Sequence, residues 1–345
     1  MITSAEHASI PMRVVGPIKI ISSELNANVK VPLATFEKPL WPSVNRGARV
    51  ALLSGGIRAT VVKDCMSRSI LLEAPDAGYA NEVVISLEER RQQLVDIVAA
   101  SSRFIKLQDW HVQIVGNLLY IRFSVQSGDA AGHNIVTKAA DALLAWIIEQ
   151  YQKLQYVSVC GNFCTDKKVS SVNGILGRGK YVVAELLVPR DICLVKLKTT
   201  PEKIVALNIK KNLIGTILSG GVRTANAHFA NMLLAFYLAT GQDAANIVEG
   251  SQGIVHAEVR GDNLYFSVTL PNIIVGSVGN GKNLNFVHNN LAILDCLEQR
   301  ELGQNARRLA IIAAATVLCG EISLLAALTN QGELMRSHIK IERGK

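Results

Sequence analysis

The segment from residue 160 to residue 180 places ionisable side chains where they could hold negative charge. It reads CGNFCTDKKVSSVNGILGRGK, with Asp166 directly before Lys167 and Lys168 and a basic run broken by glycine at its end. Two lysines beside one carboxylate favour an anionic ligand or an oxyanion that forms during a reaction. A surface loop can contain the same residues, so the segment alone predicts an anion site and no specific reaction.

Three further ionisable residues lie in segments that could carry chemistry. Glu37 lies just before a proline turn, Asp243 follows a glycine after an expected helix, and His338 lies in a basic tail. Each also has an ordinary explanation: a solvated loop carboxylate, a helix N-cap and an exposed histidine. None of them predicts an active site by itself.

Two glycine patterns match phosphate-binding loops only in part. Residues 276–282, GSVGNGK, have the Walker spacing, but Asn283 stands where Ser or Thr would bind magnesium. Residues 174–179 have the glycine spacing of a dinucleotide loop, without a strand leading straight into it. We therefore expect neither an ATP-binding loop nor a standard Rossmann fingerprint.

Composition describes a globular chain and excludes few functions. Of 345 residues, 49% are hydrophobic and 19% are charged, which is not the composition of a disordered chain. The six cysteines are scattered, so we expect reduced thiols and no metal site. The net charge of +8 would suit nucleic acid, but the basic residues are dispersed and aromatic residues are only 5%. A basic site for polyanionic small molecules explains the charge equally well.

The sequence also predicts a soluble, cytoplasmic protein that does not contact a membrane. The apolar run Leu309–Cys319 is stopped by Glu321 and is too short to span a bilayer. The first residues lack a basic stretch followed by an apolar one, so they do not form a signal peptide.

The elements that must position these residues follow from hydrophobic periodicity. Residues 70–73 predict a strand, 82–100 a helix, 110–115 and 118–125 a hairpin around Gly116-Asn117, 132–151 a helix and 156–160 a strand. This β-α-β-β-α-β order is the ferredoxin-like arrangement.

The flanking residues predict a larger mixed domain. Residues 11–69 are expected to form short strands with turns, and further strands are expected at 182–188, 254–259 and 264–269. Helices are expected at 226–240, 285–298 and 305–328, the last apolar on nearly all sides and therefore deeply buried. The fold class is α+β, with the ferredoxin-like unit inserted in the larger domain.

Short motifs in a fixed order connect these observations to a known family. They occur at residues 10–17, 43–47, 66–68, 101–104, 128–134, 160–180, 211–215, 226–231, 241–243, 275–279, 305–309 and 337–338. Together they cover essentially the whole chain, which resembles the hydroxymethylglutaryl-coenzyme A (HMG-CoA) reductase family. It looks like the class that includes the eukaryotic and archaeal enzymes, without their membrane anchor.

The resemblance implies a domain organisation. Residues 1–69 and 160–328 would form the large substrate-binding and catalytic domain, residues 70–159 the NADP-binding ferredoxin-like domain, and residues 329–345 a helical C-terminal flap. The site of this family is shared between subunits, so we expect a homodimer or a dimer of dimers.

The resemblance also implies a reaction and its catalytic residues. Enzymes of this family reduce a thioester to a primary alcohol with two hydrides from two nicotinamide cofactors. Lys167 would stabilise the oxyanion, and Asp243 would tune it. Glu37 would act as general acid toward the aldehyde, with its pKa raised by burial beside Asp243, and His338 would protonate the coenzyme A thiolate.

Binding residues carry over in the same way. The hydroxymethylglutaryl group would be held by Arg68, Asp166, Lys168 and Lys211, coenzyme A by Ser43, Asn45 and Arg46, and the substrate also by His228 and Asn231. The cofactor would be held by Ser102 and Arg103 at its 2′-phosphate and by a loop with Asp129, Ala131, Gly132, His133 and Asn134 at a helix N-terminus. This set favours NADPH, with NADH not excluded.

Several departures from the family pattern keep a second function open. Lys38 and Pro39 follow Glu37 where glycine is usual, and the added charge would lower the pKa of Glu37. Cys160 replaces a serine that contacts substrate, Ala131 and His133 replace methionines, and the usual N-terminal helix is missing. We therefore weigh an NADPH-dependent HMG-CoA reductase against a coenzyme A-binding homologue with little or no reductase activity. A nucleic-acid-binding protein is the least favoured interpretation.

Overall fold

The computed structural model describes residues 8–342, apart from the side chains of Ser337, His338, Lys340 and Glu342. Its strands are β1 (Met12–Ile21), β2 (Asn26–Ala34), β3 (Ile57–Glu73), β4 (Lys106–Val115), β5 (Leu118–Gln126), β6 (Gln155–Ser158), β7 (Gly179–Val188), β8 (Ile254–Arg260) and β9 (Asn263–Ile273). Its longer helices are α1 (Leu40–Leu53), α2 (Ala77–Glu89), α3 (Arg91–Ser101), α4 (His133–Gln150), α5 (Ser171–Leu176), α7 (Pro201–Leu207), η2 (Asn208–Gly215), α9 (Phe229–Ala239), α11 (Asn285–Ile293), α12 (Gln304–Leu328) and α13 (Glu333–Glu342). Single turns are α6 (Arg190–Ile192), η1 (Cys193–Leu197), α8 (Thr216–Leu218), η3 (Ala244–Asn246) and α10 (Ile247–Gly250).

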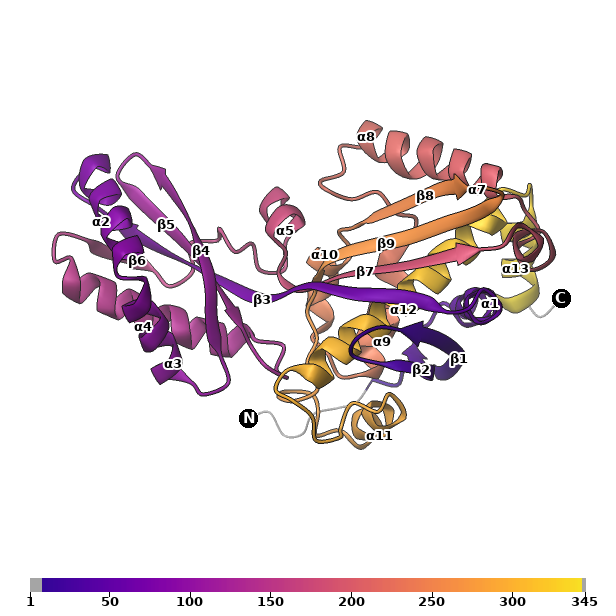
Figure 1. The fold of residues 1–345 in the computed structure, drawn as a ribbon, viewed down its shortest axis with the longest axis horizontal. Coiled ribbons are helices and arrows are strands. Elements are labelled where there is room, and N and C mark those ends of the chain that lie inside the picture. The colour runs from indigo at the N-terminus through magenta and orange to yellow at the C-terminus, as the bar shows by residue number, and fades with distance from the viewer. Residues whose placement is uncertain (1–7, 343–345) are drawn as a thin grey trace.

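Strand β3 belongs to two groups of strands (Figure 1). Its first part pairs with β1 and β7 in the order β2-β1-β3-β7-β9-β8, and its second part pairs with β5 and β6 in the order β4-β5-β3-β6. The change of partner falls between Cys65, opposite Gly179, and Met66, opposite Val125. The architecture is mixed α+β, as predicted, whereas the domain boundaries remain a prediction.

The helix predicted at residues 82–100 is wrong as a single element. Asp76 caps α2 by accepting a hydrogen bond from the Tyr79 N–H at 2.8 Å, and the chain leaves helical geometry at Arg90 before α3 begins. The break lets Leu87 of α2 and Leu94 of α3 pack on the same core as β3, β5 and α4. The hydrophobic periodicity over residues 82–100 is only approximate, and tertiary packing divides this segment into two helices.

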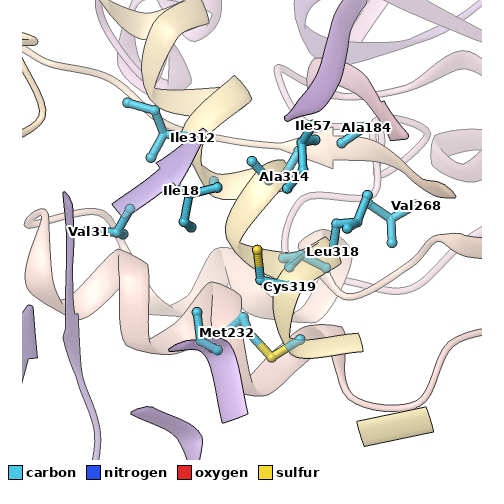
Figure 2. Packing of buried hydrophobic residues seen from close by; sticks show 14 of the residues in the cluster. Ile18, Val31, Ile57, Ala184, Met232, Val268, Ile312, Ala314, Leu318 and Cys319 are labelled. Atoms are coloured by element: carbon cyan, nitrogen blue, oxygen red, sulfur yellow. The ribbon is translucent and has the colours of Figure 1, made fainter. Parts of the chain in front are cut away.

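Helix α12 forms the centre of the larger core, which confirms the prediction of a deeply buried helix. In Figure 2, Ala314, Leu318 and Cys319 of α12 are surrounded by side chains from several elements, including Ile18, Val31, Ile57, Val268 and Met232. By length and composition α12 could cross a membrane, but 94% of its most apolar window is buried inside the protein. Its composition therefore follows from its central position.

The prediction of short strands with turns over residues 11–69 is wrong for residues 40–53, which form α1. Pro42 and Gly47 resemble turn residues, yet proline is tolerated in the first turn of a helix. Gly47 allows close contact, because a Cβ there would lie 2.1 Å from the Cys319 carbonyl oxygen of α12. Helix α1 is therefore packed directly on α12, with Ser43 and Arg46 at its edge.

The remaining predicted elements exist with different ends. Strands β7 and β9 extend beyond their predicted ranges, and α9 begins at Phe229 rather than at residue 226. Helix α11 ends at Ile293, before the predicted residue 298, because the chain turns at Asp295 with a φ of 54°. The predicted flap contains α13, which contacts α12 and is joined to α1 by an ion pair of 2.8 Å between Arg46 and Glu333.

Candidate active site

Lys167 lies in the lysine loop, which we define as residues 159–170 between β6 and α5. Figure 1 shows α5 between the two groups of strands. The loop turns sharply, with positive φ at Asn162, Thr165 and Lys167, a conformation that costs free energy for residues other than glycine. The Glu249 carboxylate stabilises this conformation by accepting a hydrogen bond from the Lys167 backbone N–H at 2.6 Å.

The Lys167 ammonium faces the Asp243 carboxylate. Their Nζ and Oδ2 atoms are 2.7 Å apart, and the two side chains are 40% and 45% exposed. The hydrogen bond to Asp243 raises the pKa of Lys167. Burial acts to raise the pKa of Asp243, but the hydrogen bonds from Lys167 and the Ala245 N–H outweigh it, and the pKa is lowered. The pair is therefore ionised at neutral pH and accessible to a ligand.

Asp166 lies at the centre of a group of charges beneath this pair. Its carboxylate is 3.0 Å from Arg178, 3.8 Å from Arg68 and 3.8 Å from His133. Arg178 also pairs with Glu249 at 2.5 Å, and both of these side chains are fully buried. Burial, followed by the Arg178 charge, lowers the pKa of His133, which favours its neutral form.

Sequence reasoning did not assign Arg178 or Glu249 to the site. Arg178 lies in the basic run of residues 177–180, so its position was a usable signal. Glu249 lies in a polar segment without any motif, and only the fold brings it to Lys167.

A polar cavity of about 450 Å³ lies at the N-terminus of α4. The lining includes Arg68, Asp166, Lys167, Asp243 and four residues of the predicted cofactor loop, Ala131, Gly132, His133 and Asn134. Within residues 8–342, α4 has the glycine Gly132 as its N-cap, with a φ of 102° and no side-chain capping hydrogen bond. A Cβ at Gly132 would lie 2.8 Å from the Ser127 hydroxyl oxygen, so the backbone here is closely packed.

Three predicted cofactor contacts lie outside the lining of this cavity. The Asp129 carboxylate accepts hydrogen bonds from the Gly303 and Ala306 N–H groups, both at 3.0 Å, and so caps α12. Ser102 ends α3, and Arg103 lines a separate cavity of about 270 Å³ beside Phe104.

Glu37 lies in a second cavity of about 350 Å³, which also contains His228, Asn231, Ser43 and Arg46. The Asn231 amide donates to the Glu37 carboxylate at 2.8 Å. The buried carboxylate of Glu321 accepts from the His228 backbone N–H at 2.6 Å and so holds the start of α9. Among the described residues, the polar cavity and the second cavity share no lining residue, so Glu37 and Asp243 line different cavities of one chain.

The other predicted residues occupy peripheral positions. Asn45 accepts a hydrogen bond from the Gly16 N–H at 2.8 Å and lines a third cavity with Lys38; this cavity shares Pro42 and Ile341 with the lining of the second cavity. Lys211 donates to Asn212 at 3.1 Å, and Lys168 donates to the Asp166 carbonyl at 3.0 Å. Cys160 is exposed. The backbone of His338 lies in α13, but its side chain is outside the described part of the structure.

Comparisons with known proteins agree with this arrangement. A family model described as hydroxymethylglutaryl-coenzyme A reductase matches residues 5–343. The 3-hydroxy-3-methylglutaryl-coenzyme A reductases of Aeropyrum pernix and Pyrococcus abyssi are each 43% identical over 337 residues. These alignments cover 97% of this chain and 80% and 82% of the two relatives.

A solved structure shares the fold. It is the class II 3-hydroxy-3-methylglutaryl-CoA reductase from Streptococcus pneumoniae bound to NADPH, with a TM-score of 0.75 and 20% sequence identity. The superposition covers 95% of this chain and 87% of that one. Because the family model matches nearly the whole chain and the relatives are 43% identical in sequence, this chain belongs to the HMG-CoA reductase family.

Proposed function

We propose that this protein reduces HMG-CoA to mevalonate and coenzyme A with NADPH, for isoprenoid synthesis. The observation that carries the proposal is the Lys167–Asp243 pair, 2.7 Å apart and accessible in the polar cavity. Family membership supports the substrate, and the Streptococcus pneumoniae reductase bound to NADPH supports the cofactor.

The residues of the polar cavity fit a dinucleotide phosphate. No side chain caps the N-terminus of α4 in the part of the chain that the structure describes, and a helix N-terminus favours negative charge. Arg68, Lys167 and Lys282 add positive charge to the same lining. Ser102 and Arg103 are proposed to contact the 2′-phosphate, which would favour NADPH over NADH.

Lys167 is the group that stabilises developing negative charge. Bound NADPH supplies the hydride in each of the two reductions, which pass through mevaldyl-CoA and mevaldehyde. The Lys167 ammonium donates toward the carbonyl oxygen that becomes the oxyanion, and Asp243 keeps this ammonium protonated and oriented. A preorganised donor of this kind contributes roughly 10²–10³-fold to the rate.

Proton transfers are assigned to Glu37 and His338. Glu37, held by Asn231, would donate a proton to the aldehyde oxygen in the second reduction. His338 on α13 would protonate the coenzyme A thiolate, a role that suits an imidazole with an ordinary pKa of about 6.5.

A second subunit would complete the site. Glu37 and Lys167 line different cavities of one chain, yet the reaction requires both at one substrate. We therefore infer a homodimer, or a dimer of dimers, in which Glu37 of one protomer meets Lys167 of the partner subunit across a two-fold axis. We also infer a class I-like enzyme that works in the cytoplasm, supported by the relatives and by the burial of α12 inside the protein.

The competing function is a coenzyme A-binding homologue with little reductase activity, motivated by Lys38 and the exposed Cys160. Steady-state oxidation of NADPH in the presence of HMG-CoA separates the two, with NADH measured in parallel. We expect turnover that is faster with NADPH. Coenzyme A binding by calorimetry without any turnover would instead establish the homologue.

A further inference from the structure

The glycine segment, residues 276–282, lies between two parts of the polar cavity. On one side the Ser277 N–H donates to the Asp129 carbonyl at 2.9 Å, and a Cβ at Gly276 would lie 2.4 Å from the Ala131 nitrogen. On its other side lies the Asp243 turn, which we define as residues 240–243, after α9. The segment therefore contacts both the start of α4 and the turn that carries Asp243.

Lys282, the last residue of this segment, binds the C-terminal end of α9. Its ammonium donates to the Thr240 carbonyl at 3.0 Å and to the Gly241 carbonyl at 2.6 Å. The final carbonyls of a helix have no partner within the helix and attract cations. Hydrogen bonds from an ammonium are also stronger than those from a neutral donor. Lys282 therefore provides the Asp243 turn with a charged anchor from another segment.

Two further contacts fix the turn against the glycine segment. The Gln242 side chain donates to the Gly276 carbonyl at 3.1 Å and accepts from the Gly276 N–H at 3.0 Å. A Cβ at Gly281 would lie 2.6 Å from the Gly241 carbonyl oxygen, so the two backbones are in direct contact. Of these three contacts, the one from Lys282 is made by a charged group.

We propose that Lys282 is a positioning residue for catalysis: by binding the carbonyls of Thr240 and Gly241, it holds Asp243 in place to orient the Lys167 ammonium. The proposal rests on the reductase function proposed above. Few contacts separate Lys282 from Lys167, because Asp243 follows Gly241 by two positions and its carboxylate lies 2.7 Å from the Lys167 ammonium. Lys282, which fills the lysine position of the partial Walker pattern, thus has a proposed role that needs no magnesium ligand.

The charge of Lys282 is sensitive to pH. Burial lowers the pKa of Lys282 to about 8. The titratable or charged side chains that line the same cavity are Arg68 on β3, His133 on α4, Asp166 and Lys167 on the lysine loop, and Asp243. Below about pH 8 the ammonium binds both carbonyls, and above it the neutral amine binds them more weakly. We therefore expect a fall in kcat on the alkaline side that depends on Lys282.

The test uses the full-length protein with Lys282→Met, Lys282→Arg and a matched control, Lys30→Met, at an exposed lysine of β2. Hydrogen–deuterium exchange over residues 240–246 reports the order of the turn without requiring activity. We expect faster exchange there in Lys282→Met, unchanged exchange in Lys30→Met, and partial rescue in Lys282→Arg. In the wild type, exchange corrected for its intrinsic pH dependence should rise as the pH passes about 8. Unchanged exchange in Lys282→Met and across this pH range would overturn the proposal, whatever the activity.

Steady-state kinetics on the same proteins test the consequence. We expect kcat to fall about ten- to a hundred-fold in Lys282→Met, with a smaller change in KM for HMG-CoA, because a misplaced catalytic group lowers the rate of the chemical step. The fall in kcat above about pH 8 should disappear in Lys282→Met and should shift to higher pH in Lys282→Arg. An active wild type whose kcat and pH profile survive Lys282→Met would also overturn the proposal. A wild type without turnover would refute the reductase function, while the exchange data would still decide whether Lys282 orders the turn.

Discussion

The charged residues around Lys167 divide into those that hold the loop and those that face the ligand. Arg178 and Glu249 are fully buried, and removing one partner of a buried pair costs about 3–5 kcal/mol. Lys167 and Asp243 are about half exposed, and exposed pairs contribute only about 0–1 kcal/mol. This difference in burial fits a structural role for Arg178–Glu249 in the loop and the catalytic role that we propose for Lys167–Asp243.

His133 should make the protein less stable in mild acid. Burial and the Arg178 charge lower its pKa in the folded protein below the ordinary 6.5, whereas the unfolded chain keeps the ordinary value. The contribution of His133 to stability is therefore fully present above pH 6.5 and is lost as the pH falls through the lowered pKa. His133→Gln should flatten this part of the curve of unfolding free energy against pH, measured by denaturant titration. The exposed His256→Gln is the control, and equal curves for wild type and His133→Gln would refute the assignment.

At the scale of elements, the close packing of α1 on α12 links the core to the second cavity. Gly47 contacts α12 at the Cys319 carbonyl, while Ser43 and Arg46 of the same helix each bind the Ser323 hydroxyl at 3.0 Å. A displacement of α1 would therefore move two predicted coenzyme A contacts at once. Arg46 also joins α13 through Glu333, so the helix that carries His338 depends on the same packing.

Gly47→Ala should destabilise the protein and weaken substrate binding together. The added Cβ would lie 2.1 Å from the Cys319 carbonyl oxygen, which α1 can avoid only by moving. We expect a loss of about 1–3 kcal/mol in unfolding free energy, typical of overpacking, and a higher KM for HMG-CoA. Thermal unfolding and steady-state kinetics measure the two effects. Gly215→Ala, where the nearest atom is 3.8 Å away, should be close to neutral in thermal unfolding, and similar losses in both variants would contradict the explanation.

The sequence allowed the prediction of elements whose pattern is strong by itself. The apolar helix at 305–328 and the hairpin around Gly116-Asn117 have clear periodicity or turn residues, and both are present. Helix α1 was missed because Pro42 and Gly47 carry a turn signal, and only the contact with α12 explains the glycine. The break at Arg90 also depends on tertiary packing.

Those residues of the candidate site that lie in short sequence motifs could be predicted from the sequence. Lys167 and Asp243 were named from short segments, and the structure places them 2.7 Å apart. Glu249 accepts a hydrogen bond from the Lys167 backbone, and Lys282 donates to the Gly241 carbonyl before Asp243. Both residues come from distant segments, which no local pattern shows. Asp129 was expected at the cofactor, but its carboxylate caps α12, a contact that depends on how the two elements pack.

At the scale of the whole molecule, the separation of the two cavities has a direct consequence for assembly. Glu37 lines one cavity with the predicted coenzyme A contacts, and Lys167 lines the other with the predicted cofactor loop. A net charge of +8 is consistent with two polyanionic ligands bound to these surfaces.

Mixing two inactive variants should therefore restore activity. If Glu37 and Lys167 of different subunits form each site, a dimer of Glu37→Gln with Lys167→Ala keeps one intact site. After random exchange of subunits, an equal mixture should recover roughly a quarter of the wild-type rate. NADPH oxidation measures the recovery, and mixing each variant with itself is the control. No recovery despite subunit exchange, monitored by native mass spectrometry, would place both residues of a site in one chain.

In the proposed reaction, Lys167 stabilises the oxyanion and two NADPH are consumed for each HMG-CoA. The most direct measurement counts NADPH oxidised against mevalonate formed, in wild type and in Lys167→Ala. We expect a ratio of two in the wild type and a loss of roughly 10²–10³-fold in kcat for Lys167→Ala, with its fold intact by thermal unfolding. A ratio of one, or a Lys167→Ala variant with wild-type kcat, would contradict the proposed reaction.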